Sequence, residues 1–177
     1  MNKSVIIAGH TGSLGSTLYH KFLDRGWVVF GASRSTGYDF RNNDIVKNFC
    51  LQLQGHDVFI NTTWGISQRL LFEAMYDLWR NKRKVIVNVS SRITQYNMAR
   101  SMSYGADKAA LDFLTNSAQM RDGQWPAVLR IRPGFFESKR LGERPEPKMK
   151  VEDVAETVMW MIDNVENFRV YDLIITK

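Results

Sequence analysis

The stretch Val5-Ile-Ile-Ala-Gly9-His-Thr-Gly12-Ser-Leu-Gly15 is the strongest indication of fold in this chain of 177 residues. Its first four residues form an apolar run, which is typical of a strand buried on both faces of a parallel sheet. Leu14, Leu18 and Phe22 then recur every four residues, which predicts a helix that Gly26 would end. Glycines between such a strand and helix favour dinucleotide binding, because the backbone can approach a pyrophosphate and the helix N-terminus offers N–H groups. The alternative is a tight turn that needs a positive φ at one glycine.

Strand and helix patterns alternate through nearly the whole chain. We expect further strands at 27–32, 57–60, 84–89, 127–132 and 170–176, and further helices at 44–53, 70–79, 103–120 and 152–163. This alternation predicts an α/β fold with one domain (residues 1–177), a Rossmann-like doubly wound parallel sheet and helices on both faces. Ser103 is the residue we expect to cap its helix. The segment 135–150 is rich in proline and charge, and we expect a short substrate lid there.

Composition indicates a globular protein, with 44% hydrophobic and 12% aromatic residues. No apolar run approaches the roughly 20 residues that span a bilayer, so we expect a soluble cytoplasmic protein with no membrane partner. Cys50 is the only cysteine and the three histidines are scattered, so we expect no metal site. The net charge of +6 raises a nucleic-acid-binding module as an alternative. Acidic residues interleave with the basic segment 139–150, which favours a solvated surface and no nucleic-acid partner.

The end of the second predicted strand bears on the choice of dinucleotide. A carboxylate there would bind the ribose 2′-hydroxyl of NAD, whereas an arginine accommodates the 2′-phosphate of NADP. The chain reads Ala32-Ser33-Arg34-Ser35 and has no carboxylate before Asp39. The forked guanidinium of Arg34 suits phosphate, with Ser33 and Ser35 as supporting donors, so NADP(H) is favoured over NAD(H). The alternative is that Arg34 is only an exposed cation at a strand end.

A second pattern lies downstream, where Ser91 is followed thirteen residues later by Tyr104-Gly-Ala-Asp-Lys108. Tyr104 and Lys108 are one helical turn apart, so their side chains share a helix face. A lysine ammonium close by favours the phenolate over the phenol, which suits Tyr104 to act as a general acid/base on a carbonyl or alcohol. Each residue also has a plain alternative. Ser91 would be a strand-end cap, Tyr104 would pack in a helix interface and Lys108 would be an exposed helix cation.

With these patterns in order, the chain resembles the short-chain dehydrogenase/reductase family, as a short, atypical member. The resemblance runs from about Val5 to Ile162 and rests on the glycine turn, Arg34, Asn88-Val-Ser-Ser91, Tyr104-Gly-Ala-Asp-Lys108 and Arg132-Pro-Gly134. It implies that Ser91 orients the substrate carbonyl, Tyr104 exchanges its proton and Lys108 binds the nicotinamide ribose. The implied cofactor-binding residues are Gly9, Thr11, Gly12, Ser13, Leu14, Gly15, Ser33, Arg34, Ser35, Asp39, Phe40, Asn61, Tyr104, Lys108, Pro133 and Gly134.

The resemblance also has specific gaps. Asp39, followed by Phe40, resembles the aspartate that contacts the adenine amino group. Where many members read Asn-Asn-Ala-Gly, this chain has Asn61-Thr-Thr-Trp64-Gly65. The further catalytic asparagine of many members has no counterpart that we can place, and Ser67 or Trp64 falls nearest.

The sequence thus predicts an NADP(H)-dependent oxidoreductase that interconverts a carbonyl and an alcohol by hydride transfer, with a small-molecule substrate. The alternative is a non-catalytic dinucleotide-binding sensor or scaffold protein that retains the fold. We also expect a homodimer or homotetramer. The reason is that the predicted helical segments 70–79 and 106–118 carry more apolar surface than one side of a sheet can cover.

Overall fold

The computed structural model describes residues 3–96, 102–121, 125–139 and 145–177. Its strands are β1 (Ser4–Ala8), β2 (Val28–Ala32), β3 (Val58–Asn61), β4 (Val85–Val89), β5 (Ala127–Pro133) and β6 (Asp172–Ile175). Its α-helices are α1 (Ser13–Asp24), α2 (Asn43–Leu53), α3 (Ile66–Trp79), α4 (Met102–Gln119) and α5 (Val151–Asp163). Two short 3-10 helices, η1 (Arg34–Thr36) and η2 (Arg92–Gln95), follow β2 and β4.

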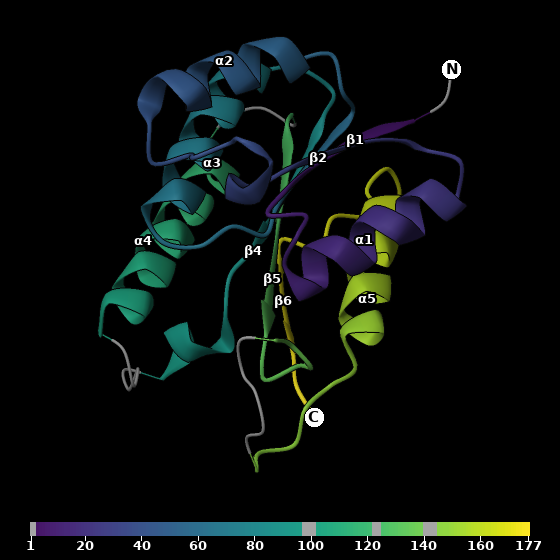
Figure 1. Ribbon diagram of the computed structural model, residues 1–177, viewed down its shortest axis with the longest axis vertical. Coiled ribbons are helices and arrows are strands. Elements are labelled where there is room, and N and C mark those ends of the chain that lie inside the picture. The colour runs from purple at the N-terminus through teal and green to yellow at the C-terminus, as the bar shows by residue number, and fades with distance from the viewer. Residues whose placement is uncertain (1–2, 97–101, 122–124, 140–144) are drawn as a thin grey trace.

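The six strands form one parallel sheet in the order β2-β1-β3-β4-β5-β6, which confirms the predicted doubly wound fold (Figure 1). In the strand order of two complete mononucleotide-binding halves, two strands lie outside the first one. Here only β2 lies outside β1, so the order reverses between β1 and β3. Open α/β sheets bind ligands in the crevice beyond the carboxyl ends of the strands at this point. The glycine loop follows β1 and therefore borders that crevice.

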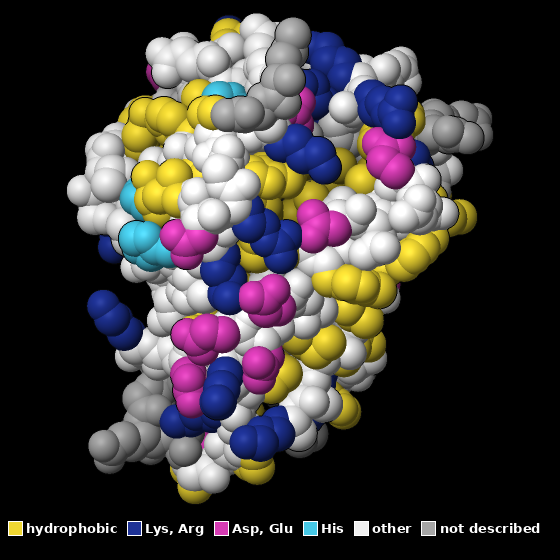
Figure 2. Space-filling view, turned by 90° about the vertical axis from the view of Figure 1, so that its right-hand side faces the viewer, with side chains coloured by type: hydrophobic (Ala, Val, Ile, Leu, Met, Phe, Trp, Pro, Cys, Tyr) yellow, Lys and Arg dark blue, Asp and Glu magenta, His cyan; other side chains and the backbone are white. Residues whose placement is uncertain are grey.

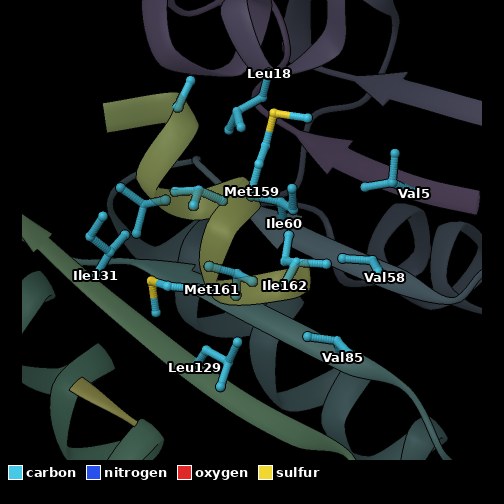
Figure 3. Close-up of a cluster of buried hydrophobic side chains, with 14 of the residues drawn as sticks. Val5, Leu18, Val58, Ile60, Val85, Leu129, Ile131, Met159, Met161 and Ile162 are labelled. Carbon is cyan, nitrogen blue, oxygen red and sulfur yellow. The ribbon is translucent and has the colours of Figure 1, made fainter. Parts of the chain in front are cut away.

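Helices α2, α3 and α4 cover one face of the sheet, and α1 and α5 cover the other (Figure 1). Successive strand side chains point to opposite faces, so Val5 and Ile7 join the cluster under α1 and α5, whereas Ile6 and Ala8 join the cluster under α2, α3 and α4. Figure 3 shows the first cluster, in which the side chains of Leu18 and Met159 approach each other between α1 and α5. The two-residue period of the strands thus places apolar side chains in both layers of the core.

Helices α3 and α4, which border the candidate site, both begin earlier than the apolar periodicity predicts. Helix α3 begins at Ile66 rather than at residue 70. The apolar pattern did not predict this first turn, because the side chain that is buried there is the polar Gln68. Helix α4 begins at Met102, so Ser103 lies inside its first turn and the prediction that Ser103 caps it is wrong. Residues 97–101, which precede α4, lie outside the described part of the chain.

The surface over α1 and α5 carries charges of both signs. Lys21 pairs with Glu156 at 2.5 Å and Arg25 pairs with Asp163 at 2.7 Å, so each pair joins the two helices. Figure 2 faces this side and shows acidic and basic side chains interleaved rather than gathered by sign. Across the ranges that the structure describes, no helix has both the length and the apolar character needed to cross a membrane.

Candidate functional site

The glycine loop requires glycine at two positions, Gly9 and Gly15. Gly9 has a φ of +86°, and its N–H donates to the carbonyl of Ala32 at 2.7 Å. A Cβ atom at Gly9 would lie 2.6 Å from Oγ1 of Thr62, and one at Gly15 would lie 2.3 Å from the carbonyl oxygen of Gly9. A tight turn would require glycine at Gly9 alone. The crowding at Gly15 shows that the first turn of α1 also packs directly onto the loop.

The N-terminus of α1 has the form that suits an anion. Gly12 is its N-cap residue, with φ −75° and ψ 161°, and offers no side chain to cap the N–H groups of the first turn. These N–H groups and the positive end of the helix dipole face the loop, which is the arrangement that holds a pyrophosphate in dinucleotide sites. Ser13 lies in this turn, and its Oγ accepts a hydrogen bond from the backbone N–H of Lys139 at 3.2 Å.

The end of β2 lies beside this loop. Ser33 is the N-cap of η1, and its N–H donates to Oγ1 of Thr36 at 3.0 Å. The hydroxyl oxygens of Ser33 and Ser35 are 3.0 Å apart, and Ser35 donates to Oγ1 of Thr11 at 3.4 Å. Arg34 is exposed between these anchored neighbours. The structure therefore brings Thr11, Ser33 and Ser35 together with Arg34 beside them, and an exposed strand-end cation stays open as the alternative for Arg34.

Asp39 and Phe40 lie further along the same connection. The carboxylate of Asp39 pairs with the guanidinium of Arg41 through a short contact. Hydrogen bonds from the side chain and then the backbone of Arg41 lower the pKa of Asp39 to about 2. Phe40 is buried and its ring stacks on that of Tyr38 at a centroid distance of 5.9 Å. The carboxylate of Asp39 is thus ionised at neutral pH and held in one place.

The three proposed catalytic residues come from the end of β4 and from α4, which packs against η2. Ser91 is the N-cap of η2, and its Oγ accepts a hydrogen bond from the N–H of Ile93 at 3.3 Å. Lys108 is only 4% exposed, and its Nζ donates to the carbonyl of Val89 at 2.8 Å. The same Nζ lies 5.8 Å from the ring centroid of Tyr104. Burial excludes the alternative that Lys108 is an exposed helix cation. The alternative that Ser91 is a cap agrees with its contact to Ile93.

Sequence reasoning missed Gln68, which belongs to this group. Its Oε1 accepts a hydrogen bond from Nζ of Lys108 at 2.6 Å. The sequence did carry a signal, because Gln68 continues the buried stripe of α3, which reads Gln68, Leu71, Phe72, Met75 and Trp79. A polar residue in the register of an apolar stripe is buried, and a buried amide needs partners. Trp64, one of the two residues nearest to the expected position of the family's further catalytic asparagine, is 57% exposed.

Asn61 is completely buried and takes part in the same network. Its Nδ2 donates to the carbonyl of Gln68 at 2.8 Å, and its Oδ1 accepts from the hydroxyl of Thr63 at 2.7 Å. The side chain of Asn61 therefore fastens the loop after β3 to the start of α3.

The segment after β5 returns toward the glycine loop. The N–H of Gly134 donates to the carbonyl of Ile175 at 2.8 Å, and Pro133 pairs with the same residue in the sheet. Phe136 and Met149 form a bridge that closes the base of the predicted lid. Residues 140–144 of that lid lie outside the described part of the chain. A cavity of about 360 Å³ borders this base, lined by Met149, Lys150, Asp153, Thr157, Ile175, Thr176 and Lys177.

The residues of the glycine loop thus fit a dinucleotide. The loop between β1 and α1 would be filled by a Cβ at Gly9 or Gly15, and it faces an uncapped helix N-terminus. Within the ranges that the structure describes, histidine, cysteine, aspartate and glutamate side chains form no group of three or more that could share a metal ion.

Solved structures share this fold over nearly the whole chain. An alcohol dehydrogenase from the archaeon Thermococcus sibiricus, complexed with 5-hydroxy-NADP, has a TM-score of 0.79 at 16% identity, covering 99% of this chain and 96% of that one. A short chain dehydrogenase from Burkholderia cenocepacia in complex with NADP has a TM-score of 0.79 at 15% identity, covering 98% and 88%. A 4-hydroxyisoleucine dehydrogenase complexed with NADH has a TM-score of 0.80 at 17% identity, covering 99% and 97%. At these identities the likeness shows the fold.

The comparison by sequence gives the family. None of the curated proteins matches the chain. The family model described as short chain dehydrogenase matches residues 57–148, which is more than half of the chain and includes Ser91, Tyr104 and Lys108. The chain belongs to the short-chain dehydrogenase family.

Proposed function

We propose that this protein is an NADP(H)-dependent oxidoreductase that interconverts a carbonyl and an alcohol by hydride transfer. The observation that carries the proposal is the buried ammonium of Lys108, which is held at the carbonyl of Val89 and lies beneath the ring of Tyr104. A buried lysine next to a tyrosine, at the carboxyl edge of a parallel sheet, places two titratable groups where open α/β sheets bind their ligands. Family membership supports an oxidoreductase independently.

The nicotinamide cofactor would supply or accept the hydride. In reduction, Ser91 and Tyr104 donate hydrogen bonds to the carbonyl oxygen as negative charge builds on it, and Tyr104 gives up its proton. The contact between Oγ of Ser91 and the N–H of Ile93 leaves the hydroxyl proton of Ser91 to donate, because a hydroxyl can accept and donate together. Lys108 binds the nicotinamide ribose and favours the phenolate form of Tyr104.

The rest of the proposed cofactor site follows the crevice. The glycine loop, with Thr11, Ser13 and Leu14, holds the pyrophosphate at the N-terminus of α1. Arg34 binds the 2′-phosphate with Ser33 and Ser35 beside it, which gives the preference for NADP(H) over NAD(H). The remaining positions are Asp39 and Phe40 at the adenine, and Asn61, Pro133 and Gly134 around the nicotinamide half.

The experiment that tests the proposal is a screen of NADPH oxidation against aldehydes, ketones, quinones and sugar-nucleotide ketones, with Tyr104→Phe as the control. Turnover that the Tyr104→Phe variant lacks would support the proposal. Tight binding of NADPH with no turnover on any class would instead favour the sensor or scaffold alternative.

We also propose that the protein forms a homodimer or homotetramer through α3 and α4. These helices lie side by side on one face of the sheet (Figure 1). On α4, Phe113 is 71% exposed, and a cavity of about 230 Å³ between the two helices is lined in part by Phe72, Tyr76, Leu114 and Ala118. Exposed apolar groups around a groove are typical of interaction surfaces. A cytoplasmic location and the lack of nucleic-acid and membrane partners stay predictions from the sequence.

A further inference from the structure

Gln68 is the link between helix α3 and the lysine of the proposed active site. Its side chain is 2% exposed and uses all of its polar groups. Oε1 accepts a hydrogen bond from Nζ of Lys108 at 2.6 Å, while Nε2 donates to the carbonyls of Asn61 at 3.0 Å and Val89 at 2.8 Å. Gln68 therefore joins the ends of β3 and β4 to α4.

The orientation of this amide is imposed by its partners. Carbonyl oxygens accept hydrogen bonds and cannot donate them, so the NH₂ group of Gln68 must face the carbonyls of Asn61 and Val89. Oε1 is then directed at Lys108. A second contact fixes the helix turn itself, because Nδ2 of Asn61 donates back to the carbonyl of Gln68 at 2.8 Å. Rotation of the amide would lose the two donated bonds and the bond from Lys108 together.

The charge of the side chain at position 68 matters as much as its geometry. Lys108 donates to Gln68 and to the carbonyl of Val89, and both acceptors are neutral. A carboxylate in the place of the amide would form an ion pair with the ammonium and cancel much of its electrostatic effect on neighbouring groups. The ring of Tyr104, 5.8 Å from Nζ, is one of those groups.

We propose that Gln68 is a positioning residue, which holds the ammonium of Lys108 near Tyr104 with a neutral acceptor that does not offset its positive charge. This inference rests on the proposed function, in which Tyr104 exchanges a proton with the substrate. Gln68 touches neither substrate nor cofactor in this proposal and acts through Lys108. It explains why a glutamine, rather than an apolar residue, stands in the buried stripe of α3.

Other charged groups lie on α4 and on the elements β5 and η2 that pack against it. On α4, the carboxylate of Asp107 approaches the start of α3, with Oδ2 at 3.7 Å from the position of a Cβ on Gly65. One turn further, Asp112 lies 3.6 Å from Arg130, which β5 contributes. From η2, Arg92 lies over the ring of Tyr96 and donates to Thr176 at 2.6 Å. All of these groups are unchanged in the variants below, so differences between variants report on position 68.

The test is a titration of the Tyr104 phenolate, which needs no turnover. For each protein, the ultraviolet absorbance of phenolate is measured against pH, and the curve of the same protein carrying Tyr104→Phe is subtracted. Gln68→Glu keeps the length of the side chain and adds a charge, which is ionised at the alkaline pH where phenolate forms. We expect the midpoint to move to higher pH by about 1 unit or more, because a carboxylate beside Lys108 opposes the phenolate.

Gln119→Glu is the matched control. Nε2 of Gln119 also donates to two carbonyls, those of Val128 at 3.0 Å and Tyr171 at 2.7 Å, but it lies at the far end of α4 from Lys108. Both variants lose two donated hydrogen bonds and should melt at lower temperature. Only Gln68→Glu should move the phenolate midpoint. Equal midpoints in the two variants would overturn the inference, whereas a shift without turnover on any substrate would support it and count against the proposed function.

Gln68→Met and Gln119→Met provide a second comparison should the glutamate variant fail to fold. Methionine matches the length of glutamine and leaves Lys108 without this acceptor. We expect NADPH to bind about tenfold more weakly to Gln68→Met than to Gln119→Met, which corresponds to one hydrogen bond. Equal affinities in calorimetry would overturn the anchoring role.

Discussion

The hydroxyl of Ser35 donates to Oγ1 of Thr11 at 3.4 Å, which joins the end of β2 to the glycine loop. Arg34 precedes Ser35 in η1, and the turn is closed by the bond from the N–H of Ser33 to Oγ1 of Thr36 at 3.0 Å. The backbone on both sides of Arg34 is therefore held while its side chain stays exposed. The start of the Arg34 side chain is therefore fixed beside the glycine loop, and its guanidinium is exposed to solvent.

Arg34→Ala should remove most of the preference for NADPH over NADH. A charged hydrogen bond contributes about 1.5–3 kcal/mol, so the ratio of the two affinities should fall by roughly ten- to a hundredfold. Calorimetric titration of both cofactors into both proteins measures this ratio. Arg41→Ala is the matched control, because Arg41 is an exposed arginine on the same connection and pairs with Asp39. Equal losses for NADPH and NADH in Arg34→Ala would contradict the assignment.

The proposed catalytic residues should separate by their effects. Tyr104→Phe should abolish turnover and leave NADPH affinity nearly unchanged, because only the hydroxyl is lost. Lys108→Met should lower both, because Lys108 also binds the ribose in the proposal. Ser91→Ala should cost about a hundred- to a thousandfold in rate, as for a lost oxyanion donor. Steady-state rates and calorimetry check these outcomes, and wild-type turnover in Tyr104→Phe would reject the assignment.

Gly15→Ala should disturb the glycine loop more than Gly12→Ala. A Cβ at Gly15 would lie 2.3 Å from the carbonyl oxygen of Gly9, whereas one at Gly12 would lie 3.3 Å from the same atom. Overpacking of this kind costs about 1–3 kcal/mol, because helix α1 must move away from the loop. The free energy of unfolding in denaturant and the affinity for NADPH should both fall further in Gly15→Ala. Equal values for the two variants would show that the close approach is not required.

The thiol of Cys50 should be inert in the folded protein. Burial raises the pKa of Cys50 to about 12, and only the thiolate is reactive. The unfolded thiol ionises at lower pH, so this group stabilises the folded state below about pH 9 and less as the pH rises toward 12. At pH 8 a thiol reagent should react with Cys50 only after denaturant is added. A cysteine introduced by Gln52→Cys, at an exposed position of α2, should react at once, and rapid reaction of native Cys50 would contradict its burial.

Self-association should depend on the outer surface of α4. Phe113→Glu places a charge where 71% of the side chain is exposed, so it should weaken a dimer that buries this helix without harming the fold. Leu23→Glu is the control, because Leu23 is 43% exposed on α1, across the sheet. Light scattering at micromolar concentration checks the mass. A wild-type mass of 20.5 kDa, that of one chain, would reject the proposed oligomer.

Periodic features of the sequence were sufficient to predict the layers of this fold. The apolar run at Val5 and the stripe at Leu14, Leu18 and Phe22 correspond to β1 and to the buried side of α1. They could be predicted because a strand or helix buries residues at the spacing set by its own backbone. The glycine turn is equally local, since Gly9 needs a positive φ whatever lies around it.

The sequence could not give the strand order or the anchoring of Lys108. Alternating strands and helices do not show that only one strand, β2, lies outside β1. Gln68 and Lys108 are 40 residues apart, and their hydrogen bond exists because α3 and α4 pack side by side on one face of the sheet. Periodicity reports which side chains are buried, whereas the partner of a buried polar group is set by the packing of distant segments. Tertiary structure alone therefore paired the lysine of the proposed active site with a neutral amide.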